Sequence, residues 1–194
     1  MRSWSFAANL FVLAGLALST GGCASLVVGG AATAGVAAAQ ERGLGGAARD
    51  TVIQAKINDL WFRHDVDMFR KLGLTVNQGR VLVTGRAATP EMRLDAVRLA
   101  WQVDGVTEVI NEVEVDDRSG IQDAALDTWI ATQLRGKLMF DREISSINYT
   151  IDTVNGVIYL MGSARNQAEL DRVTGHARSL PHVKRVVSYV RVIG

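Results

Sequence analysis

The chain has 194 residues, a formal net charge of +1 and one cysteine. A single cysteine excludes a disulfide framework within the chain, which small exported proteins often have. The near-balanced charge hides a division, because the two halves of the chain carry opposite net charges, as described below.

Residues 1–22 have the pattern of a secretory signal peptide. Arg2 gives a basic start, Phe6–Leu18 is apolar except for Asn9, and small residues follow up to Gly22. The apolar run is too short to span a bilayer comfortably, and its flanks are those of an export signal. We therefore expect the chain to leave the cytoplasm.

Cys23 lies directly after this signal, in the stretch "LALSTGGCASL". The stretch resembles a bacterial lipobox, in which the cysteine is acylated and becomes the new N-terminus. Thr20 stands where a lipobox usually has leucine, and ordinary signal-peptidase cleavage with a free thiol is the alternative. Residues 23–48, rich in Ala and Gly, then form the predicted tether, and an anchor of three acyl chains would be effectively permanent.

The rest of the chain is a tandem repeat. A shift of 77 residues aligns the two copies without a gap, and Gly79 and Gly85 fall on Gly156 and Gly162. The repeat predicts domains at 49–117 and 126–194, with a linker at 118–125. Each copy is small enough to be marginal alone, so we expect the two to pack together or share an environment.

Each copy begins with an amphipathic helix. Asp50 and Asp127 are interpreted as its N-caps, since a short carboxylate can accept hydrogen bonds from the first turn. The predicted buried stripes recur at four-residue spacing: Ile53, Ile57 and Trp61 in the first copy, and Ile130, Leu134 and Leu138 in the second.

A hairpin, a second helix and a last strand follow. Alternating apolar residues in 72–85 and 149–162 predict the hairpins, with the turn Asn155-Gly156 in the second copy. Thr89-Pro90 and the capping box at Asn166–Glu169 start the second helix. The fold class is α+β: each copy is α-β-β-α-β, with a small mixed three-stranded sheet packed against two helices and a parallel crossover between strands two and three.

This unit, with "GRVLVTG" in its hairpin and "VDGVTEVINEVEV" at its end, resembles the BON domain. Two such units behind a lipoprotein signal, the second beginning "DTWIATQLRGKL", resemble the dual BON-domain outer-membrane lipoproteins. The second copy has His182 where the family usually has glycine and Ser188 where it usually has asparagine. The resemblance implies a non-enzymatic lipoprotein of a Gram-negative outer membrane, facing the periplasm. Such a protein binds anionic phospholipid through its second domain and supports envelope integrity, often at division sites.

The two copies differ in charge. Residues 49–117 hold 9 basic and 12 acidic side chains, a net charge of −3, whereas residues 118–194 hold 10 and 7, a net charge of +3. Thr107, Glu108 and Glu114 of the first copy correspond to Lys184, Arg185 and Arg191 of the second. A basic face attracts anionic headgroups at about 1 kcal/mol per residue, although the same charges would also attract the two domains to each other. Nucleic acid is not expected for an exported chain without an aromatic stacking platform.

The first helix of the second copy also gains aromatic residues beside its buried stripe. The stripe concerned is Trp129, Gln133, Gly136 and Phe140, which replaces Val52, Lys56, Asp59 and Arg63 of the first copy. Met139 lies near the helix end, and Arg135 and Lys137 can reach phosphate. We predict a phospholipid-binding surface here. The alternatives are that Trp129 and Phe140 pack against the other domain, or that the same surface docks an envelope protein partner.

No catalytic arrangement is recognisable. His176 and His182 have no carboxylate at ligand spacing, Ser145 and Ser146 have no neighbouring base, and the glycine-rich segments lack the Lys-Ser/Thr of a phosphate-binding loop. We therefore expect no enzyme activity, metal, cofactor or small-molecule substrate.

Overall fold

A computed structural model describes residues 43–116 and 121–194. The predicted signal peptide, Cys23 and most of the predicted tether lie outside these residues. Within the described ranges, no helix combines the length and the apolar character that a membrane span needs.

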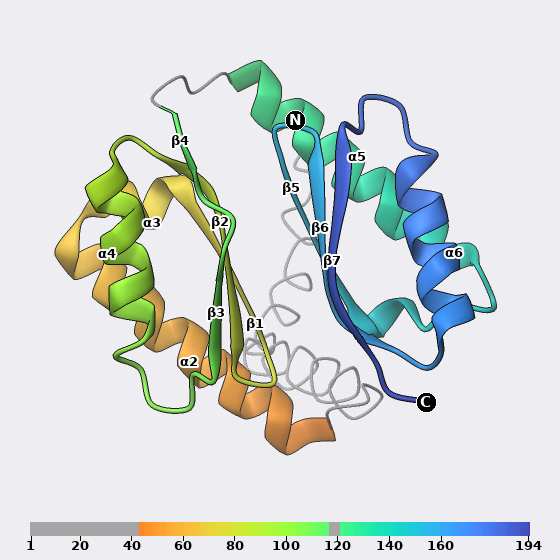
Figure 1. The fold of residues 1–194 in the computed structure, drawn as a ribbon, viewed down its shortest axis with the longest axis horizontal. Coiled ribbons are helices and arrows are strands. Elements are labelled where there is room, and N and C mark those ends of the chain that lie inside the picture. Colours follow the sequence, from red (N-terminus) through yellow and green to blue (C-terminus); the bar gives the residue numbers. More distant parts are fainter. Residues whose placement is uncertain (1–42, 117–120) are drawn as a thin grey trace, which may run out of the picture. The chain divides into compact units, whose positions relative to one another are not determined.

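The first domain has its helices on one face of a mixed sheet (Figure 1). The central strand β2 is antiparallel to β1 and parallel to β3 and β4, which lie one after the other along it. The elements are α2 (Gly43–His64), α3 (Val66–Lys71), β1 (Leu72–Asn77), β2 (Arg80–Ala87), α4 (Pro90–Ala100), β3 (Glu108–Asn111) and β4 (Glu114–Val115).

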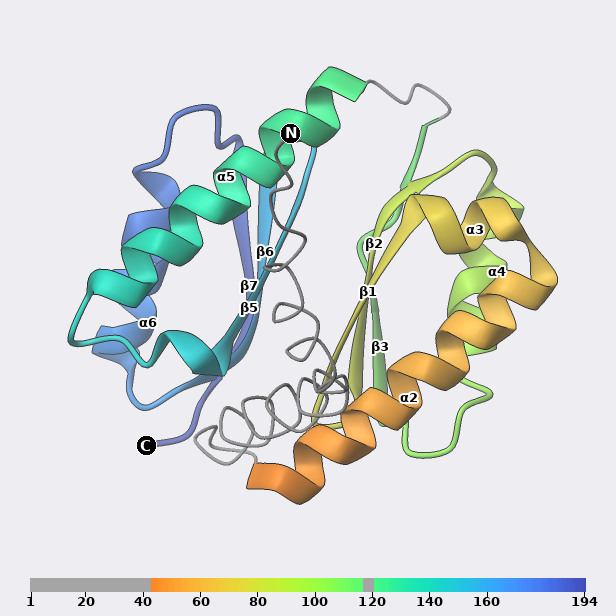
Figure 2. The same cartoon turned by 180° about the vertical axis from the view of Figure 1, so that it is seen from behind.

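The second domain repeats this order around the central strand β6, which is antiparallel to β5 and parallel to β7. The view from behind shows α2 and α5 as the long helices of the two domains (Figure 2). The elements are α5 (Ile121–Phe140), the short 3-10 helix η1 (Ser146–Asn148), β5 (Tyr149–Val154), β6 (Val157–Ala164), α6 (Gln167–Arg178) and β7 (Arg185–Val192). The α+β fold predicted from the repeat is confirmed.

The two predicted helix stripes form the cores. In α2 and α5 all six stripe residues are at most 5% exposed, and they pack against the strands and the second helix of their own domain. The second helices start where predicted: Thr89 accepts from the N–H of Met92, and Asn166 accepts from the N–H of Glu169. Apolar periodicity is therefore enough to identify the buried face of α2 and α5, and capping residues are enough to place the starts of α4 and α6.

Asp50 and Asp127 are not N-caps, which corrects the interpretation from sequence. The helices begin earlier, at Gly43 and Ile121, so neither aspartate meets free helix N–H groups. Instead Asp127 accepts from the N–H groups of Asn155 and Gly156, both at 2.7 Å, and Asp50 accepts in the same way from the equivalent turn of its own hairpin. The turn residues have positive φ, 54° at Asn155 and 76° at Gly156, and these exposed N–H groups need an acceptor. Each carboxylate thus fastens the first helix to the hairpin turn.

The early helix starts also change the predicted boundaries. The last residues of the predicted tether, from Gly43, and of the predicted linker, from Ile121, are helical. Alanines in both stretches favour helix, and the hydroxyl of Thr51 donates to the carbonyl of Ala47 inside α2. The predicted linker is therefore shortened at its C-terminal end.

The copies differ most at two connections. Asp65 caps α3 by accepting from the N–H of Asp67, whereas the second domain has only the turn η1 at the equivalent place. In the last strand, the side chain of Asn111 accepts from the N–H of Val113 and divides β3 from β4. Ser188 stands at the equivalent position of β7, which is continuous.

The described residues, 43–116 and 121–194, belong to one compact unit, in which the two sheets share an apolar cluster. Leu82 of the first domain is 1% exposed within it, and the second domain supplies Val157, Tyr159 and Met161. Around the cluster Arg80 donates to the carbonyl of Tyr189 at 2.8 Å, and the hydroxyl of Tyr189 bonds to Glu112. The two small domains are thus stabilised by each other as well as by their own cores.

Candidate functional site

The exposed side of α5 carries three large apolar side chains. Trp129 is 41% exposed, Met139 69% and Phe140 86%. Their helix is held by Ile130, Leu134 and Leu138 on its other side, which are at most 1% exposed. Helical periodicity therefore separates a buried face from a solvent face on which large apolar side chains are exposed.

The ring of Trp129 packs edge-on against His182, with ring centroids 6.4 Å apart. His182 belongs to the α6–β7 connection of the same domain and has a positive φ of 68°. Phe140 is almost fully exposed at the end of α5. This geometry speaks against the alternative in which both rings are buried against the other domain.

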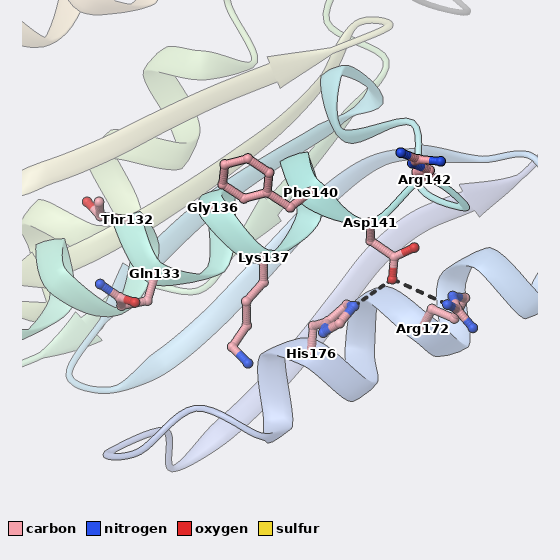
Figure 3. A pocket seen from close by; sticks show the side chains of 9 residues that line it. All are labelled: Thr132, Gln133, Gly136, Lys137, Phe140, Asp141, Arg142, Arg172 and His176. Carbon is pink, nitrogen blue, oxygen red and sulfur yellow. Dashed lines mark hydrogen bonds and ion pairs between the residues drawn. The ribbon is translucent and has the colours of Figure 1, made fainter.

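An open hollow of about 680 Å³ lies between α5 and α6 (Figure 3). Its walls come from α5, from the residues that follow α5, and from α6. The lining residues are Thr132, Gln133, Gly136, Lys137, Phe140, Asp141, Arg142, Arg172 and His176. Gln133, Lys137 and Phe140 were predicted from sequence, and the structure brings these three together in one place.

Asp141 organises the polar end of the hollow. Its Oδ2 accepts from His176 Nε2 at 2.8 Å and lies 3.5 Å from Arg172, while its Oδ1 accepts from the N–H of Glu143 at 3.0 Å (Figure 3). The hydrogen bond from His176, supported by the Glu143 N–H and by Arg172, holds the pKa of Asp141 below its usual value although partial burial opposes this. Asp141 is therefore ionised at neutral pH and fixes both α6 side chains.

The hollow has an excess of positive charge. Its lining contains three cations, Lys137, Arg142 and Arg172, and one carboxylate, that of Asp141. Arg172 is shared between Asp141 and Glu143, at 3.5 and 2.9 Å. Within the described residues, Lys137 and Arg142 have no carboxylate within salt-bridge distance. Unpaired cations around a concave surface attract anions.

The first domain fills the equivalent place differently. Lys137 and His176 correspond to Leu60 and Leu99, and both leucines pack with the core of the first domain. Both domains have a polar pair between the end of the first helix and the second helix, with acid and base exchanged. In the first domain His64 bonds to Asp95 at 3.1 Å, and at the equivalent positions of the second domain Asp141 pairs with Arg172. The cationic hollow is thus a departure of the second copy from a shared framework.

The other predicted site residues do not line the hollow. Arg135 donates to the carbonyl of Ile151 at 3.0 Å, and Lys184 lies beside Gly156 at the hairpin. Arg191 donates to Gln78 at 3.3 Å, and so it meets the first domain.

Arg185 is also on the side of the shared cluster. It lies beside Tyr159, whose pKa is raised to about 12 by burial and by Glu112, against the opposing effect of Arg185. Successive side chains of a strand alternate between faces, so Arg185, Tyr189 and Arg191 share one face of β7. Part of the charge difference between the copies therefore serves the contact between the domains.

Sequence reasoning missed Arg142, Arg172 and His176. The two α6 residues lie more than 30 positions from the stripe of α5, and only the packing of α6 on α5 brings them close. A signal was present in the repeat, because Leu99 and Asp95 of the first copy become His176 and Arg172. At Leu99 a buried apolar position of the first copy is polar in the second, and such a change indicates a site.

The described residues contain no group of three or more His, Cys, Asp or Glu side chains placed to hold a metal ion. The arrangement in the hollow instead offers cationic and hydrogen-bonding groups next to an exposed phenyl ring, which suits an amphiphilic anion.

The fold defines a class of small α+β modules, used here twice in tandem. The chain belongs to the BON domain family, whose sequence model matches residues 49–117 and 126–194. It is 42% identical to an Anaplasma centrale protein described as "Uncharacterized protein in gshII 5'region", over 144 residues, 74% of this chain and 94% of the relative. It is 25% identical over 186 residues to the outer membrane lipoprotein DolP of Haemophilus influenzae, covering 95% of this chain and 96% of the relative. The osmotically-inducible protein Y of Escherichia coli is 28% identical over 139 residues, 71% of this chain and 69% of the relative.

Proposed function

We propose that this protein is an outer-membrane lipoprotein that faces the periplasm and binds anionic phospholipid through its second BON domain. The observation that carries the proposal is the exposed apolar end of α5, with Phe140 86% and Met139 69% exposed, next to the cationic hollow. An exposed apolar group beside cations suits the boundary between acyl chains and phosphate headgroups.

The apolar and the basic side chains contact different parts of the lipid. Phe140, Met139 and the free edge of Trp129 enter the apolar boundary, while Lys137 reaches a phosphate with its charged end and keeps its stem on the helix surface. Basic residues near an anionic surface contribute about 1 kcal/mol each, so the hollow strengthens binding and makes it sensitive to salt.

The anchor and the compartment rest on the sequence and on the similarity to DolP, whose printed description is an outer membrane lipoprotein. Acylated Cys23 holds the chain on the membrane, and the second domain then selects where on the membrane it sits. A tethered site meets lipid at high effective concentration, so a weak headgroup preference biases its position. In this way the protein supports envelope integrity, with enrichment at division sites.

Vesicle co-sedimentation tests the lipid-binding step. A fragment from Ala24 to Gly194 retains both hydrophobic cores and lacks Cys23, the residue proposed to be acylated, so its binding reports the domains without the anchor. We expect it to sediment with vesicles that contain phosphatidylglycerol, to release in high salt, and to ignore pure phosphatidylcholine vesicles. Absence of binding to both vesicle types would overturn the proposal.

A second candidate function is a scaffold that docks an envelope protein on the same α5 surface. The exposure of Trp129 and Phe140 favours it as much as it favours lipid, because aromatic anchors are common in protein interfaces. Failure of vesicle binding combined with a single cross-linked envelope partner, lost in Phe140→Ala, would favour this candidate.

The anchor is tested separately by Cys23→Ala in cells. We expect the variant to leave the outer-membrane fraction and to accumulate as an unprocessed or soluble species. Fractionation identical to that of the wild type would rule out acylation as the anchor.

A further inference from the structure

We propose that the outer face of α4 is a self-association surface, on which a second copy of this chain docks its own α4 in antiparallel orientation. The surface consists of Pro90, Leu94, Val97 and Trp101, and we refer to these four residues as the α4 stripe. This inference goes beyond the proposed function, because it concerns the first domain and needs no lipid.

The α4 stripe is apolar although it faces solvent. Leu94 is 63% exposed and Trp101 52%. Pro90 is also exposed, and Val97 is half-buried. The N–H of Trp101 donates to the carbonyl of Val97 at 3.1 Å, so the backbone stays helical past the last residue of α4 and keeps the indole in line with the stripe. Exposed apolar surface of this kind marks interaction sites.

The core of the first domain uses a different face of α4. Ala96, Leu99 and Ala100 are buried there, together with Val81 of the strand β2 beneath the helix. Leu82, the next residue of β2, belongs to the cluster shared with the second domain, because successive side chains of a strand point to opposite faces. The helix α4 is therefore on the side of its sheet that is turned away from the shared cluster (Figure 1).

The equivalent positions of the second domain are polar. They are Gln167, Asp171, Thr174 and Arg178 of α6. A polar solvent face is the ordinary state of a surface helix. The fold that the two copies share therefore does not need the apolar residues of the α4 stripe, and their presence in the first copy calls for a partner.

The spacing within the α4 stripe is typical of helices that pair with each other. Its residues follow one another at intervals of four, three and four positions, which is the spacing of the a and d positions of a coiled coil. If a second α4 lies antiparallel, with Leu94 against Val97 of the second copy, Pro90 lies against Trp101 of the second copy. A two-fold axis then relates the copies, and every contact is made twice.

The charges beside the α4 stripe favour the antiparallel orientation. Glu91 and Arg98 flank the same edge of the stripe, and both are exposed. An antiparallel pair brings Glu91 of each copy next to Arg98 of the other, whereas a parallel pair keeps them about 10 Å apart along the helix axis. Arg98 already pairs with Asp95 of its own helix at 2.8 Å, so its guanidinium would be shared between two carboxylates.

The size of the α4 stripe predicts weak association. From the exposure of Leu94 and Trp101, each chain offers roughly 300 Å² of apolar surface, against about 800 Å² per partner in a stable complex. We therefore expect a dissociation constant on the order of 100 μM in solution. The acylation of Cys23 proposed above would concentrate the chains on a membrane and raise the fraction of dimer.

Sedimentation equilibrium of the fragment from Ala24 to Gly194, from about 20 to about 500 μM, measures the association. Leu94→Asp introduces the residue that α6 has at this position, and Val52→Asp is the matched control, since Val52 is 53% exposed on α2. We expect Leu94→Asp to weaken association at least about tenfold and Val52→Asp less than about twofold. Melting temperatures near that of the wild type exclude loss of folding in both variants.

Introduced cysteines test the orientation. The fragment lacks Cys23, so these cysteines are its only thiols. Under mild oxidation a mixture of Glu91→Cys and Arg98→Cys should form a disulfide-linked dimer, and each variant alone should form far less of it. The matched mixture of Ala168→Cys and Gly175→Cys has its thiols at the equivalent exposed positions of α6 and should stay monomeric.

A monomeric fragment at every concentration, or equal weakening by Leu94→Asp and Val52→Asp, would overturn self-association through the α4 stripe. Equal cross-linking in the α4 and α6 mixtures would overturn the antiparallel pairing. A monomeric fragment that binds another envelope protein, with binding lost in Leu94→Asp, would assign the stripe to that protein instead of a second copy. Vesicles play no part in these measurements, so each of these failures leaves the proposed lipid function standing.

Discussion

Phe140 offers the sharpest test of membrane contact, because its ring is 86% exposed and therefore contributes little to the folded domain. A phenylalanine buries roughly 150–250 Å² when fully enclosed, so about 170 Å² of this residue is free to enter a bilayer. At 25 cal/mol per Å² full insertion is worth about 4 kcal/mol, and partial insertion at the headgroup boundary about half of that. Phe140→Ala should then weaken binding to phosphatidylglycerol vesicles about 30-fold.

The same reasoning ranks a second aromatic residue below the first. Trp129 is 41% exposed and its ring also packs on His182, so less of it is free for the membrane. About 90 Å² is available, and Trp129→Ala should weaken binding about fivefold while lowering the melting temperature slightly.

The assay is co-sedimentation of the fragment from Ala24 to Gly194 with vesicles, and its stability is checked by thermal melting followed by circular dichroism. Phe62→Ala is the control, since Phe62 is 54% exposed at the end of α2 in the first domain. It should leave vesicle binding unchanged. The reasoning is refuted if Phe62→Ala and Phe140→Ala weaken binding equally, or if Phe140→Ala binds as the wild type does.

Three further predictions concern the second domain. Asp127→Ala removes the acceptor of two 2.7 Å hydrogen bonds from the hairpin turn, and it should lower the free energy of unfolding in urea by about 2 kcal/mol. Asp127→Asn should lower it less, and an equal loss in both variants would count against the proposed role of the carboxylate. Burial alone would raise the pKa of Glu169, but the N–H groups of Ser145 and Arg165 and the Arg165 guanidinium donate to the carboxylate and hold the pKa below its usual value. The ionised Glu169 carboxylate therefore stabilises the fold above its unfolded pKa, near 4.3, and this stabilisation is lost as the pH falls through the lower folded pKa. The melting temperatures of Glu169→Gln and the wild type should then converge at acidic pH. A constant difference between them from about pH 7 to about pH 3 would contradict this. Gly162 has a φ of 138°, and a Cβ there would lie 1.9 Å from the carbonyl oxygen of Asn148. Gly162→Ala should therefore destabilise the protein by about 3 kcal/mol or more. A melting temperature equal to that of the wild type would mean that the backbone can shift to make room for the methyl group.

The sequence was sufficient for those parts of the fold that depend on local pattern. The repeat is visible when the chain is aligned with itself. The buried stripes and the caps at Thr89 and Asn166 depend on residues a few positions apart, where periodicity and capping chemistry are decisive. The Asn155-Gly156 turn followed for the same reason, since its positive φ values are restricted to few residue types.

Long-range roles could not be read in the same way. Asp127 has the local appearance of a helix cap, but its partners are 28 and 29 residues away in the hairpin. Arg185 and Arg191 read as an anion-binding face, yet one lies beside Tyr159 and the other donates to Gln78 of the first domain. The sequence shows where a charged residue lies along a strand, but not which residue its side chain contacts in the folded protein.

The candidate site was predicted in part. Trp129, Gln133 and Phe140 were recognised because the first copy supplied a comparison at the same helix positions, and Lys137 was included as a nearby cation that can reach phosphate. Arg142, Arg172 and His176 complete the hollow from segments whose distance from α5 depends on tertiary packing.

The replacement of two leucines of the first copy by polar residues in the second has an evolutionary consequence. Leu60 and Leu99 contribute to the core of one copy, whereas Lys137 and His176 open the same place in the other. A single-domain ancestor could not have made both choices, because a leucine that is buried as Leu99 is contributes roughly 1.5–3 kcal/mol to a small domain with little stability in reserve. Duplication removes that conflict, because the first copy can keep its leucines packed in the core while the second copy acquires polar residues at the equivalent positions. Selection should therefore act on these paired positions with different strength in the two copies, and apolar residues should persist longest in the first.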